Sequence, residues 1–487
     1  MVTVDGDPTL LGIKTGGKIY FVGIGGYSMC GLAAICQSAG YLVRGSDMEM
    51  SSRTKQLAKG GVLVYHGHES DNIDDFKPDC VVYSVAVDLS NPEISRAREL
   101  GIPLFERSYF LGGINRLYKN VINISGTHGK TTTTTMCSLI LVEAGLDPTA
   151  HIGAMVSDWG NTVRIGKSHD IFVSEACEYN SSFLRFYSTT AAILNIDHDH
   201  VDCFPKIEDV IDVFAEFACT VPPTGSLVIP SFDRNIPAML KKVQDNKMSK
   251  GEEALDLPEI ITFGREFDLI NNEKPNFYIT DYKLQDGYPS FDVYRDNSFL
   301  CHIDLVIPGE YNAMNALAAI ACAVINGADG NSCARVVSNF HGADNRFSDR
   351  GTYKGAAVIA DYAHHPSAIS ASFLAASDIT KGRVWPVFQP ITFNRVIGLF
   401  DEFVSALLEC PDSMIFEVYT SRESDSQGFS AKMICDKINS LGGSSNFMDG
   451  YETLKAALDE KISPGDLILF MGPEGLKEIA DRLVAGQ

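Results

Sequence analysis

Ser125-Gly-Thr-His-Gly-Lys-Thr-Thr132 is the strongest structural signal in the sequence. The apolar residues 121–124 precede it and the run 131–144 follows it, so we expect a strand, a glycine-bearing turn and a helix. Backbone N–H groups at the start of such a helix bind phosphate. Lys130 could reach the β- and γ-phosphates of a nucleotide, and the hydroxyl of Thr131 could bind Mg²⁺.

The strict phosphate-loop pattern has a glycine at position 124, where this chain has Ile124. The alternative is a plain strand–turn–helix corner in which Gly-Lys-Thr occurs by chance. Because a strand and a helix flank the turn as the motif requires, we predict a nucleotide loop. The residues expected to contact ATP here are Gly126, Thr127, His128, Gly129, Lys130, Thr131 and Thr132.

Carboxylates and imidazoles follow the next expected strands, at 171–174 and 191–196. They lie in Glu175-Ala-Cys-Glu178 and Asn195-Ile-Asp-His-Asp-His-Val-Asp202. The carboxyl ends of parallel strands hold the ligand sites of α/β proteins, and Mg²⁺ prefers oxygen ligands, which a histidine can join. We predict that carboxylates of these two motifs, joined by a histidine of the second, hold Mg²⁺ together with Thr131. The alternative is a solvated acidic loop beside an ordinary exposed glutamate.

An earlier glycine turn, Gly23-Ile-Gly-Gly26, follows a short apolar strand. The dinucleotide fingerprint has a third glycine where Ser28 stands, and Asp47 occupies the place of a ribose-binding carboxylate. We predict that this block binds a nucleotide diphosphate, although not necessarily NAD. A tight turn with no ligand is the alternative.

Two asparagines and two arginines are further candidates. Asn312 and Asn315 lie near the start of a helix, where an amide can pair with an adenine edge, or Asn312 can cap the helix. Arg346 and Arg395 can each bind a phosphate or a carboxylate in bidentate fashion, or form surface ion pairs.

The order of expected elements indicates three α/β domains, at 1–118, 119–336 and 337–487. The first and third are expected to be Rossmann-like. The central one is expected to combine a parallel sheet of the phosphate-loop type with a small antiparallel part. That part is an alternating hairpin at 277–285 and 290–294.

The composition limits the partners. A net charge of -22 disfavours nucleic acid and anionic membrane surfaces, whereas single basic residues still allow small anionic substrates. The 12 cysteines form no Cys-x-x-Cys pair, which is typical of buried thiols in a reducing cytoplasm. No signal peptide or membrane-spanning run is visible, so we expect a cytoplasmic protein without membrane insertion.

Taken in order along residues 18–485, these motifs resemble the Mur ligase family. The motifs that carry the resemblance are Gly23-Ile-Gly-Gly26, Gly45-Ser-Asp47, Asn91-Pro-Glu93, Gly126-Thr-His-Gly-Lys-Thr-Thr132, Glu175-Ala-Cys-Glu178, Asn195 with His200 and Asp202, Gly309 with Asn312 and Asn315, Arg346-Phe347, and Asp361-Tyr-Ala-His-His-Pro366. The combined order is highly specific, although no single motif is.

The resemblance implies an ATP- and Mg²⁺-dependent ligase in peptidoglycan precursor synthesis. It is strongest to the branch of the family that joins L-alanine to the carboxylate of UDP-N-acetylmuramate through an acyl phosphate. The catalytic residues it implies are Lys130, Glu175 and His200, with Thr131 and Glu175 on the ATP-bound Mg²⁺ and His200 on a second Mg²⁺. The ATP contacts also include Asn312, Asn315 and Arg346. The UDP-sugar contacts are Gly23, Gly25, Gly26, Ser46, Asp47 and Ser84, and the amino-acid contacts are Tyr362, His364 and Arg395.

The departures from the family pattern lie in the C-terminal third. Ile391-Thr-Phe393 replaces a run such as His-Arg-Tyr, Met471-Gly-Pro-Glu-Gly475 replaces Met-Gly-Ala-Gly-Asp, and Asn345-Arg346 replaces a paired Arg-Arg. They leave two alternatives open, a ligase for another amino acid or a peptide, and a paralogue that binds ATP and UDP-sugar with little activity. A third alternative, an NAD-dependent oxidoreductase, is suggested only by the glycine turn at 23–26.

Overall fold

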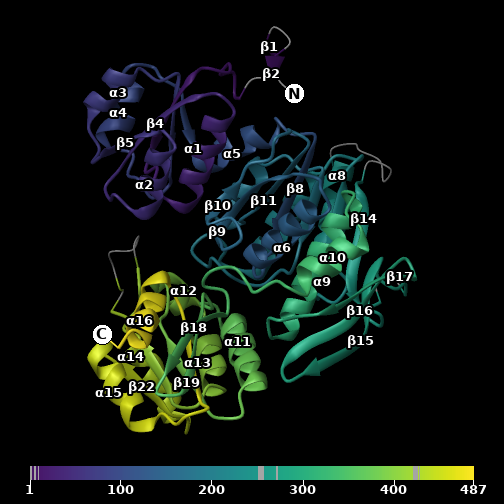
Figure 1. The fold of residues 1–487 in the computed structure, drawn as a ribbon, viewed down its shortest axis with the longest axis vertical. Coiled ribbons are helices and arrows are strands. Elements are labelled where there is room, and N and C mark those ends of the chain that lie inside the picture. Colours follow the sequence, from purple (N-terminus) through teal and green to yellow (C-terminus); the bar gives the residue numbers. More distant parts are fainter. Residues whose placement is uncertain are drawn as a thin grey trace.

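Three sheets, each built from one continuous part of the chain, form the cores of the protein. The structure is a computed structural model that describes residues 3–4, 7–8, 10–249, 257–269, 272–420, 426 and 428–486. We call the parts that hold these sheets the N-terminal, central and C-terminal parts. Figure 1 shows them in purple to blue, blue to teal, and green to yellow.

The N-terminal part is a parallel five-stranded sheet covered by helices. Its strands are β3 (Lys18–Val22), β4 (Leu42–Asp47), β5 (Leu63–His66), β6 (Cys80–Tyr83) and β7 (Leu104–Glu106), preceded by the short pair β1 (Thr3–Val4) and β2 (Asp7–Pro8). Its helices are α1 (Tyr27–Ser38), α2 (Ser52–Lys59), α3 (Ser70–Phe76), α4 (Pro92–Glu99) and α5 (Arg107–Asn115). The strand order β5-β4-β3-β6-β7 reverses at β3. The turn that begins at Gly23 therefore lies at the switch point, where doubly wound sheets bind ligands.

The central part holds a mixed ten-stranded sheet, β10-β9-β11-β8-β12-β13-β14-β15-β16-β17. Its strands are β8 (Asn120–Ser125), β9 (Thr149–Val156), β10 (Asn161–Arg164), β11 (Ile171–Glu175), β12 (Thr190–Ile193), β13 (Ser226–Pro230), β14 (Glu259–Arg265), β15 (Phe277–Gln285), β16 (Tyr288–Arg295) and β17 (Ser298–Asp304). Neighbours from β9 to β15 pair in parallel, whereas β10, β16 and β17 pair antiparallel. This confirms the expected parallel sheet with a small antiparallel part.

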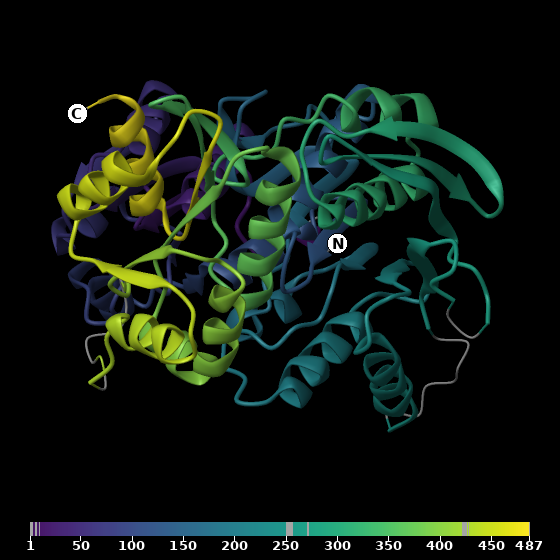
Figure 2. The same ribbon diagram turned by 90° about the horizontal axis from the view of Figure 1, so that it is seen from below.

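The helices of the central part begin with α6 (Lys130–Glu143), which follows the phosphate-loop sequence. The others are η1, a 3-10 helix (Tyr179–Arg185), α7 (Ile207–Cys219), α8 (Ile236–Ser249), α9 (Glu310–Ile325) and α10 (Gly330–Val337). The alanine-rich α9 packs against α6, since small side chains allow close approach. Figure 2 shows the strands of the hairpin extending from the central part, and the turn between β15 and β16 at Gly287 lies against Asp378 and Ile379 at the end of the C-terminal helix α11 (Pro366–Ile379).

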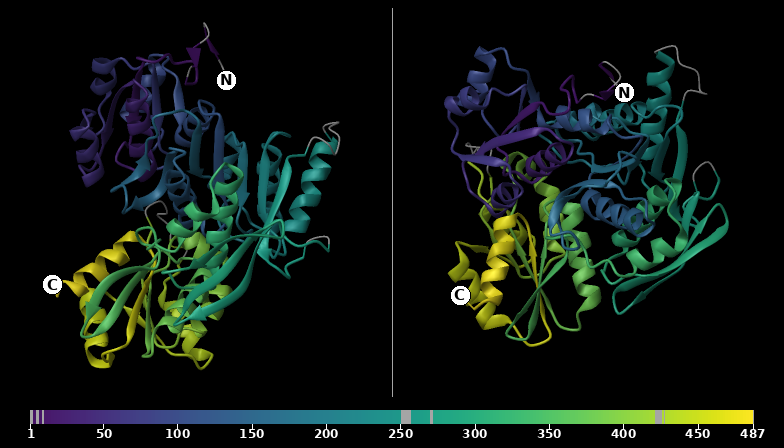
Figure 3. Two further views of the ribbon diagram at one scale, coloured as in Figure 1. Left: turned by 45° about the vertical axis from the view of Figure 1, so that its right-hand side comes forward. Right: turned by 45° about the horizontal axis from the view of Figure 1, so that its top comes forward.

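The C-terminal part is a six-stranded sheet in the order β18-β19-β23-β20-β21-β22, in which only β18 runs antiparallel. Its strands are β18 (Ser348–Tyr353), β19 (Ala356–Asp361), β20 (Val384–Phe388), β21 (Ser413–Phe416), β22 (Ser445–Met448) and β23 (Leu467–Met471). Its helices are α11 (Pro366–Ile379), α12 (Phe393–Gly398), α13 (Phe400–Leu408), α14 (Lys432–Ser440), α15 (Tyr451–Lys461) and α16 (Glu474–Val484). Both views in Figure 3 place this part below the N-terminal part, with the teal central strands beside them.

Burial follows the apolar pattern of the sequence. Strand residues such as Phe21, Val173 and Phe470 are almost fully buried. All the cysteines are free, and most are buried as small core residues, as expected. No helix in the part of the chain that the structure describes combines the length and the apolar character needed to cross a membrane.

Candidate functional site

Three neighbouring strands bring the predicted residues together. In the central sheet β8 lies between β11 and β12, and all three run in parallel. The phosphate-loop sequence therefore leaves the sheet between Glu175, which ends β11, and Asn195, which follows β12. The structure thus brings together motifs that the sequence separates by up to about 70 residues, as parallel pairing predicts.

The loop requires glycine at two positions. Gly126 and Gly129 have φ angles of 138° and 85°, in the region that favours glycine. A Cβ on Gly129 would overlap Oδ1 of Asn315 in α9, so a side chain fits here only if the loop or Asn315 moves. No side chain caps α6 at Gly129. The first N–H groups of the helix are therefore free of a side-chain cap and suit an anion.

The side chain of Asn195 holds the loop from the neighbouring strand end. Its Oδ1 accepts a hydrogen bond from the backbone N–H of His128 at 2.8 Å, and its Nδ2 donates to the carbonyl of His128 at 3.0 Å. Asn195 was not among the predicted site residues. Its position at a strand end was the available signal, but only the structure shows this two-point contact.

Lys130 folds back onto its own loop. Its Nζ donates to the carbonyls of Gly126 and Thr127, at 2.5 and 3.1 Å, and forms an ion pair with Glu178 at 3.0 Å. Burial acts to lower the pKa of Lys130, but the Glu178 carboxylate outweighs it and the pKa is raised overall. The group is therefore a cation at neutral pH, already positioned at the phosphate loop.

Glu178 is a site residue that the sequence prediction missed. Its side chain is 2% exposed, and its Oε1 lies 3.7 Å from Nε2 of His200 while its other oxygen contacts Lys130. The only signal in the sequence was a second acid three residues after Glu175. Spacing alone did not distinguish a buried partner of the lysine from an exposed glutamate.

The predicted metal ligands lie at two places in the site. The Thr131 hydroxyl donates to Oε2 of Glu175 at 3.1 Å, and Oε1 of Glu175 accepts the N–H of Gly153 at 2.7 Å. His200 lies instead beside Glu178 and Asp199, and burial lowers its pKa although both carboxylates act to raise it. A hydroxyl beside a carboxylate fits the oxygen preference of Mg²⁺. A neutral imidazole beside a carboxylate can help to bind a second Mg²⁺ ion.

The remaining predicted ATP contacts lie around the loop. Asn315 touches Gly129, and Nη2 of Arg346 donates to the hydroxyl of Thr131 at 3.3 Å while its guanidinium stacks on Tyr362. Asn312 is buried within α9, where its Nδ2 donates to the carbonyl of Pro308 at 2.7 Å. Gly309 is the N-cap of α9, so the alternative of capping by Asn312 is wrong.

The C-terminal part reaches the site through Arg395. Its Nε donates to Oδ1 of Asp199 at 2.7 Å, and both side chains are buried. Burial acts to raise the pKa of Asp199, but the guanidinium and nearby imidazoles hold it well below its usual range. His364 lies close by, with Nδ1 2.6 Å from the carbonyl of Tyr362, and burial and Arg395 lower its pKa.

The predicted UDP-sugar contacts are arranged around the switch point of the N-terminal sheet. The N–H of Gly25 donates to Oδ2 of Asp47 at 2.8 Å, and Gly23 turns with φ 77° beside Ser84. The hydroxyl of Ser46 is buried and donates to Glu93 at 2.5 Å. The side chain of Ser46 therefore supports the fold, and its role in binding a UDP-sugar stays a prediction.

The fold and the site define a class of protein: a three-part α/β protein with a phosphate loop in the middle part that contacts the third. Matches to family models cover nearly the whole chain. They are the Mur ligase family, catalytic domain, at residues 18–119, the Mur ligase middle domain at 124–323, and the Mur ligase, glutamate ligase domain at 345–473.

Relatives of known name agree with these matches. The chain is 38% identical to a UDP-N-acetylmuramate–L-alanine ligase of Acetivibrio thermocellus, covering 96% of this chain and 95% of that one. It is also 38% identical to the enzyme of that name from Clostridium novyi, with 96% and 97% covered. The solved structure of a UDP-N-acetylmuramate–alanine ligase from Thermotoga maritima superposes with a TM-score of 0.75 at 26% identity, covering 96% and 99% of the two chains. The chain belongs to the Mur ligase family.

Proposed function

We propose that this protein joins L-alanine to the carboxylate of UDP-N-acetylmuramate at the expense of ATP, in the synthesis of peptidoglycan precursors. Relatives 38% identical over nearly the full length bear the name of that enzyme. The observation that carries the proposal is the meeting of the phosphate loop, Glu175 and His200 at three adjacent strand ends. The family offers no support for the oxidoreductase alternative.

The chemistry needs an activated carboxylate, because a carboxylate has no good leaving group. The γ-phosphoryl group moves from ATP to a carboxylate oxygen, which gives an acyl phosphate and ADP. The amine of L-alanine then attacks the acyl carbon, the C–O bond to phosphate breaks, and the amine loses a proton. The products are the amide, ADP and phosphate.

Transfer between two anions requires positive charge at the phosphates. In the proposal Lys130 leaves Glu178 and the loop carbonyls and binds the β- and γ-phosphates, while the free N–H groups of α6 hold the same oxygens. Thr131 and Glu175 would hold Mg²⁺ on the nucleotide, and His200 a second Mg²⁺. Bound Mg²⁺ neutralises charge that develops on the phosphoryl oxygens.

The C-terminal part would bind the amino acid. His364 and Arg395 lie at the junction with the central part. The ring of Tyr362 stacks on the guanidinium of Arg346, which lies beside the phosphate loop. The pairing of Arg395 with Asp199 supports a role in holding this junction as well as in binding a carboxylate. We place the reaction in the cytoplasm, since the free cysteines fit a reducing compartment.

The proposal is tested by an amino-acid screen. The wild-type protein is incubated with UDP-N-acetylmuramate, ATP, Mg²⁺ and each amino acid in turn, with phosphate release and product mass as the readouts. We expect phosphate release to require both the sugar and L-alanine, and the product mass to show one added alanine. Turnover with another amino acid alone would revise the substrate, and no amide product with any of them would support the inactive paralogue.

A further inference from the structure

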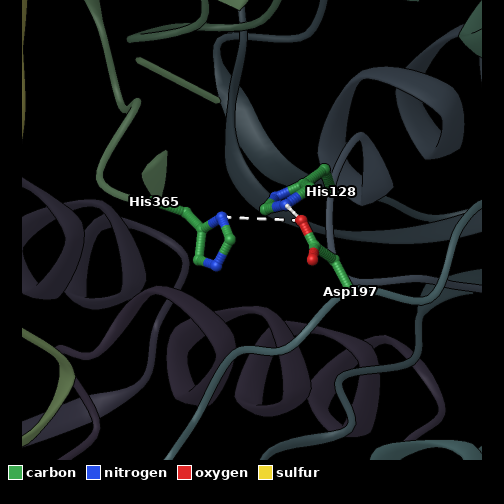
Figure 4. Close-up of side chains that lie close together, drawn as sticks. All are labelled: His128, Asp197 and His365. Atoms are coloured by element: carbon green, nitrogen blue, oxygen red, sulfur yellow. Dashed lines mark hydrogen bonds and ion pairs between the residues drawn. The ribbon is translucent and has the colours of Figure 1, made fainter. Parts of the chain in front are cut away.

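Two imidazoles and a carboxylate converge where the phosphate loop faces the C-terminal part (Figure 4). His128 lies in the loop, Asp197 follows β12, and His365 is the N-cap of α11. One ring nitrogen of each histidine and one oxygen of Asp197 lie within 4.8 Å of one another. None of the three belongs to the Mg²⁺ ligands discussed above, so the cluster needs its own explanation.

The hydrogen bonds of His365 determine which nitrogen carries its proton. Nε2 lies 3.0 Å from the carbonyl of His198, which can only accept, so this nitrogen bears the hydrogen. Nδ1 accepts the backbone N–H of Ser367 in the N-cap of α11. This contact is long, at 3.4 Å, and the same nitrogen lies 3.7 Å from Oδ2 of Asp197, so Nδ1 is the nitrogen of His365 that a metal ion could use. A carbonyl behind a histidine is the usual arrangement that orients an imidazole toward a metal.

Asp197 lies between the two imidazoles. Its Oδ2 lies 3.2 Å from Nε2 of His128, 3.7 Å from Nδ1 of His365 and 2.5 Å from the hydroxyl of Ser367. That hydroxyl is also 2.8 Å from Nδ1 of His365. A cation bound here would replace the hydrogens of His128 and Ser367 that Asp197 accepts, and would draw one lone pair from each imidazole and one from the carboxylate.

We propose that His128, Asp197 and His365 form a binding site for a divalent transition-metal ion of the Zn²⁺ class, separate from the Mg²⁺ sites. Two imidazole nitrogens and one carboxylate oxygen are the ligands of such borderline ions and not of Mg²⁺. Three protein ligands leave a fourth position of a tetrahedral ion for water. Because His128 and Asp197 come from the central part and His365 from the C-terminal part, the bound ion ties the phosphate loop to α11.

The test measures metal binding directly, without nucleotide or Mg²⁺. Isothermal titration calorimetry with Zn²⁺, and absorption spectra with Co²⁺, are recorded for the full-length wild type, Asp197→Asn, His365→Ala and His365→Gln. The control is His302→Ala, because His302 also contacts two carboxylates but offers a different ring nitrogen to each, Asp292 and Asp304. Thermal melts establish that each variant is folded.

We expect the wild type to bind one Zn²⁺ per chain, and the Asp197 and His365 variants to bind it at least about tenfold more weakly. His302→Ala should match the wild type. The Co²⁺ spectrum should show the absorption of nitrogen and oxygen ligands without thiolate charge transfer. Thiolate charge transfer, unchanged affinity in the folded His365 variants, or no binding by the wild type up to millimolar metal would each overturn the proposal.

Discussion

At the scale of the residue, Lys130 and Glu178 determine how the phosphate loop is kept ready for an anion. The ammonium is held at the loop by two carbonyls and by a carboxylate that is almost fully buried. Each of these contacts is with an acceptor, as the oxygens of a nucleotide would be. A phosphate that binds at this point can therefore take over the lysine without leaving it unpaired.

Replacing Lys130 by alanine should remove the positive charge at the transferred phosphoryl group. We expect Lys130→Ala to lower the rate of ADP formation at least about a hundredfold while UDP-sugar binding is kept. Steady-state ADP release and calorimetry with the UDP-sugar measure the two effects. The control is Lys119→Ala, since Lys119 forms an exposed ion pair with Asp170 and should turn over normally. Near-normal turnover of Lys130→Ala would show that Lys130 is not needed for phosphoryl transfer.

Some site residues could be predicted from the sequence and others could not. Lys130 and Thr131 follow from motif spacing, Glu175 from its place at a strand end, and His200 from the family resemblance. The structure places all four around the loop. Asp199, by contrast, lies in an acidic run in which nothing in the sequence marks it as the partner of an arginine. Its partner Arg395 is 196 residues away, and no local pattern predicts that pairing.

At the scale of the element, α6 has a glycine with positive φ at each end. Gly129 precedes the helix with φ 85°, and Gly145 follows it with φ 73°. A Cβ at Gly145 would meet no atom within 4 Å, whereas a Cβ at Gly129 would lie 2.2 Å from Oδ1 of Asn315. Both glycines have a backbone conformation that favours glycine, but only Gly129 has another atom close to the position of a Cβ.

Replacing each glycine by alanine should separate the cost of backbone strain from the cost of the contact with Asn315. We expect Gly145→Ala to cost about 1 kcal/mol through its left-handed backbone alone. Gly129→Ala should cost about 1–3 kcal/mol more and weaken ATP binding, because the loop or α9 must move. Thermal melts and ATP titrations of both variants measure this. The double variant Gly129→Ala/Asn315→Ala should recover part of the lost stability. Equal destabilisation by Gly129→Ala and Gly145→Ala would show that the contact with Asn315 does not matter.

Elements with strong local patterns were predicted well. The strand before the phosphate loop, expected at 121–124, and the hairpin of β15 and β16 match their expected positions closely. Strands β9, β13 and β14 were not foreseen, although they complete the central sheet. They are buried against helices or neighbouring strands, so their residues lack the alternation that marks a half-exposed strand.

At the scale of the whole molecule, several side-chain contacts join the three parts, and two of them involve a buried ionisable group. Arg395 of α12 pairs with Asp199 across the junction of the C-terminal and central parts. His151 of β9 contacts Ser28 of α1 across the junction of the central and N-terminal parts. Domain boundaries at 118 and 336 stay predictions, but both contacts lie between parts that the sequence analysis had separated.

Removing Arg395 should leave Asp199 buried without its partner. We expect Arg395→Ala to destabilise the protein by about 3–5 kcal/mol, and to raise the KM for L-alanine more than the KM for ATP. The control, Arg335→Ala, breaks an exposed ion pair with Glu143 and should cost less than about 1 kcal/mol. Thermal melts and steady-state kinetics test both effects. Equal changes of the two KM values would argue against a role at the amino-acid end.

The junction at His151 should make stability depend on pH. Burial lowers the pKa of His151 to about 4, and its Nδ1 has no hydrogen-bond partner among the described residues. Between pH 6.5 and 4 the unfolded chain binds a proton that the folded chain cannot, so stability falls as the pH falls. The loss is about 2 kcal/mol by pH 5. Melting midpoints at pH 7.5 and 5 should therefore differ less in His151→Gln than in the wild type; an equal difference would contradict this.

The central claim is that the loop from Gly126 to Lys130 receives the phosphates of ATP. A crystal structure with a non-hydrolysable ATP analogue, Mg²⁺ and UDP-N-acetylmuramate tests it most directly. We expect the triphosphate on the N–H groups at the start of α6, with Nζ of Lys130 moved from Glu178 onto the phosphate oxygens. A triphosphate bound elsewhere, with Lys130 still paired to Glu178, would contradict the account.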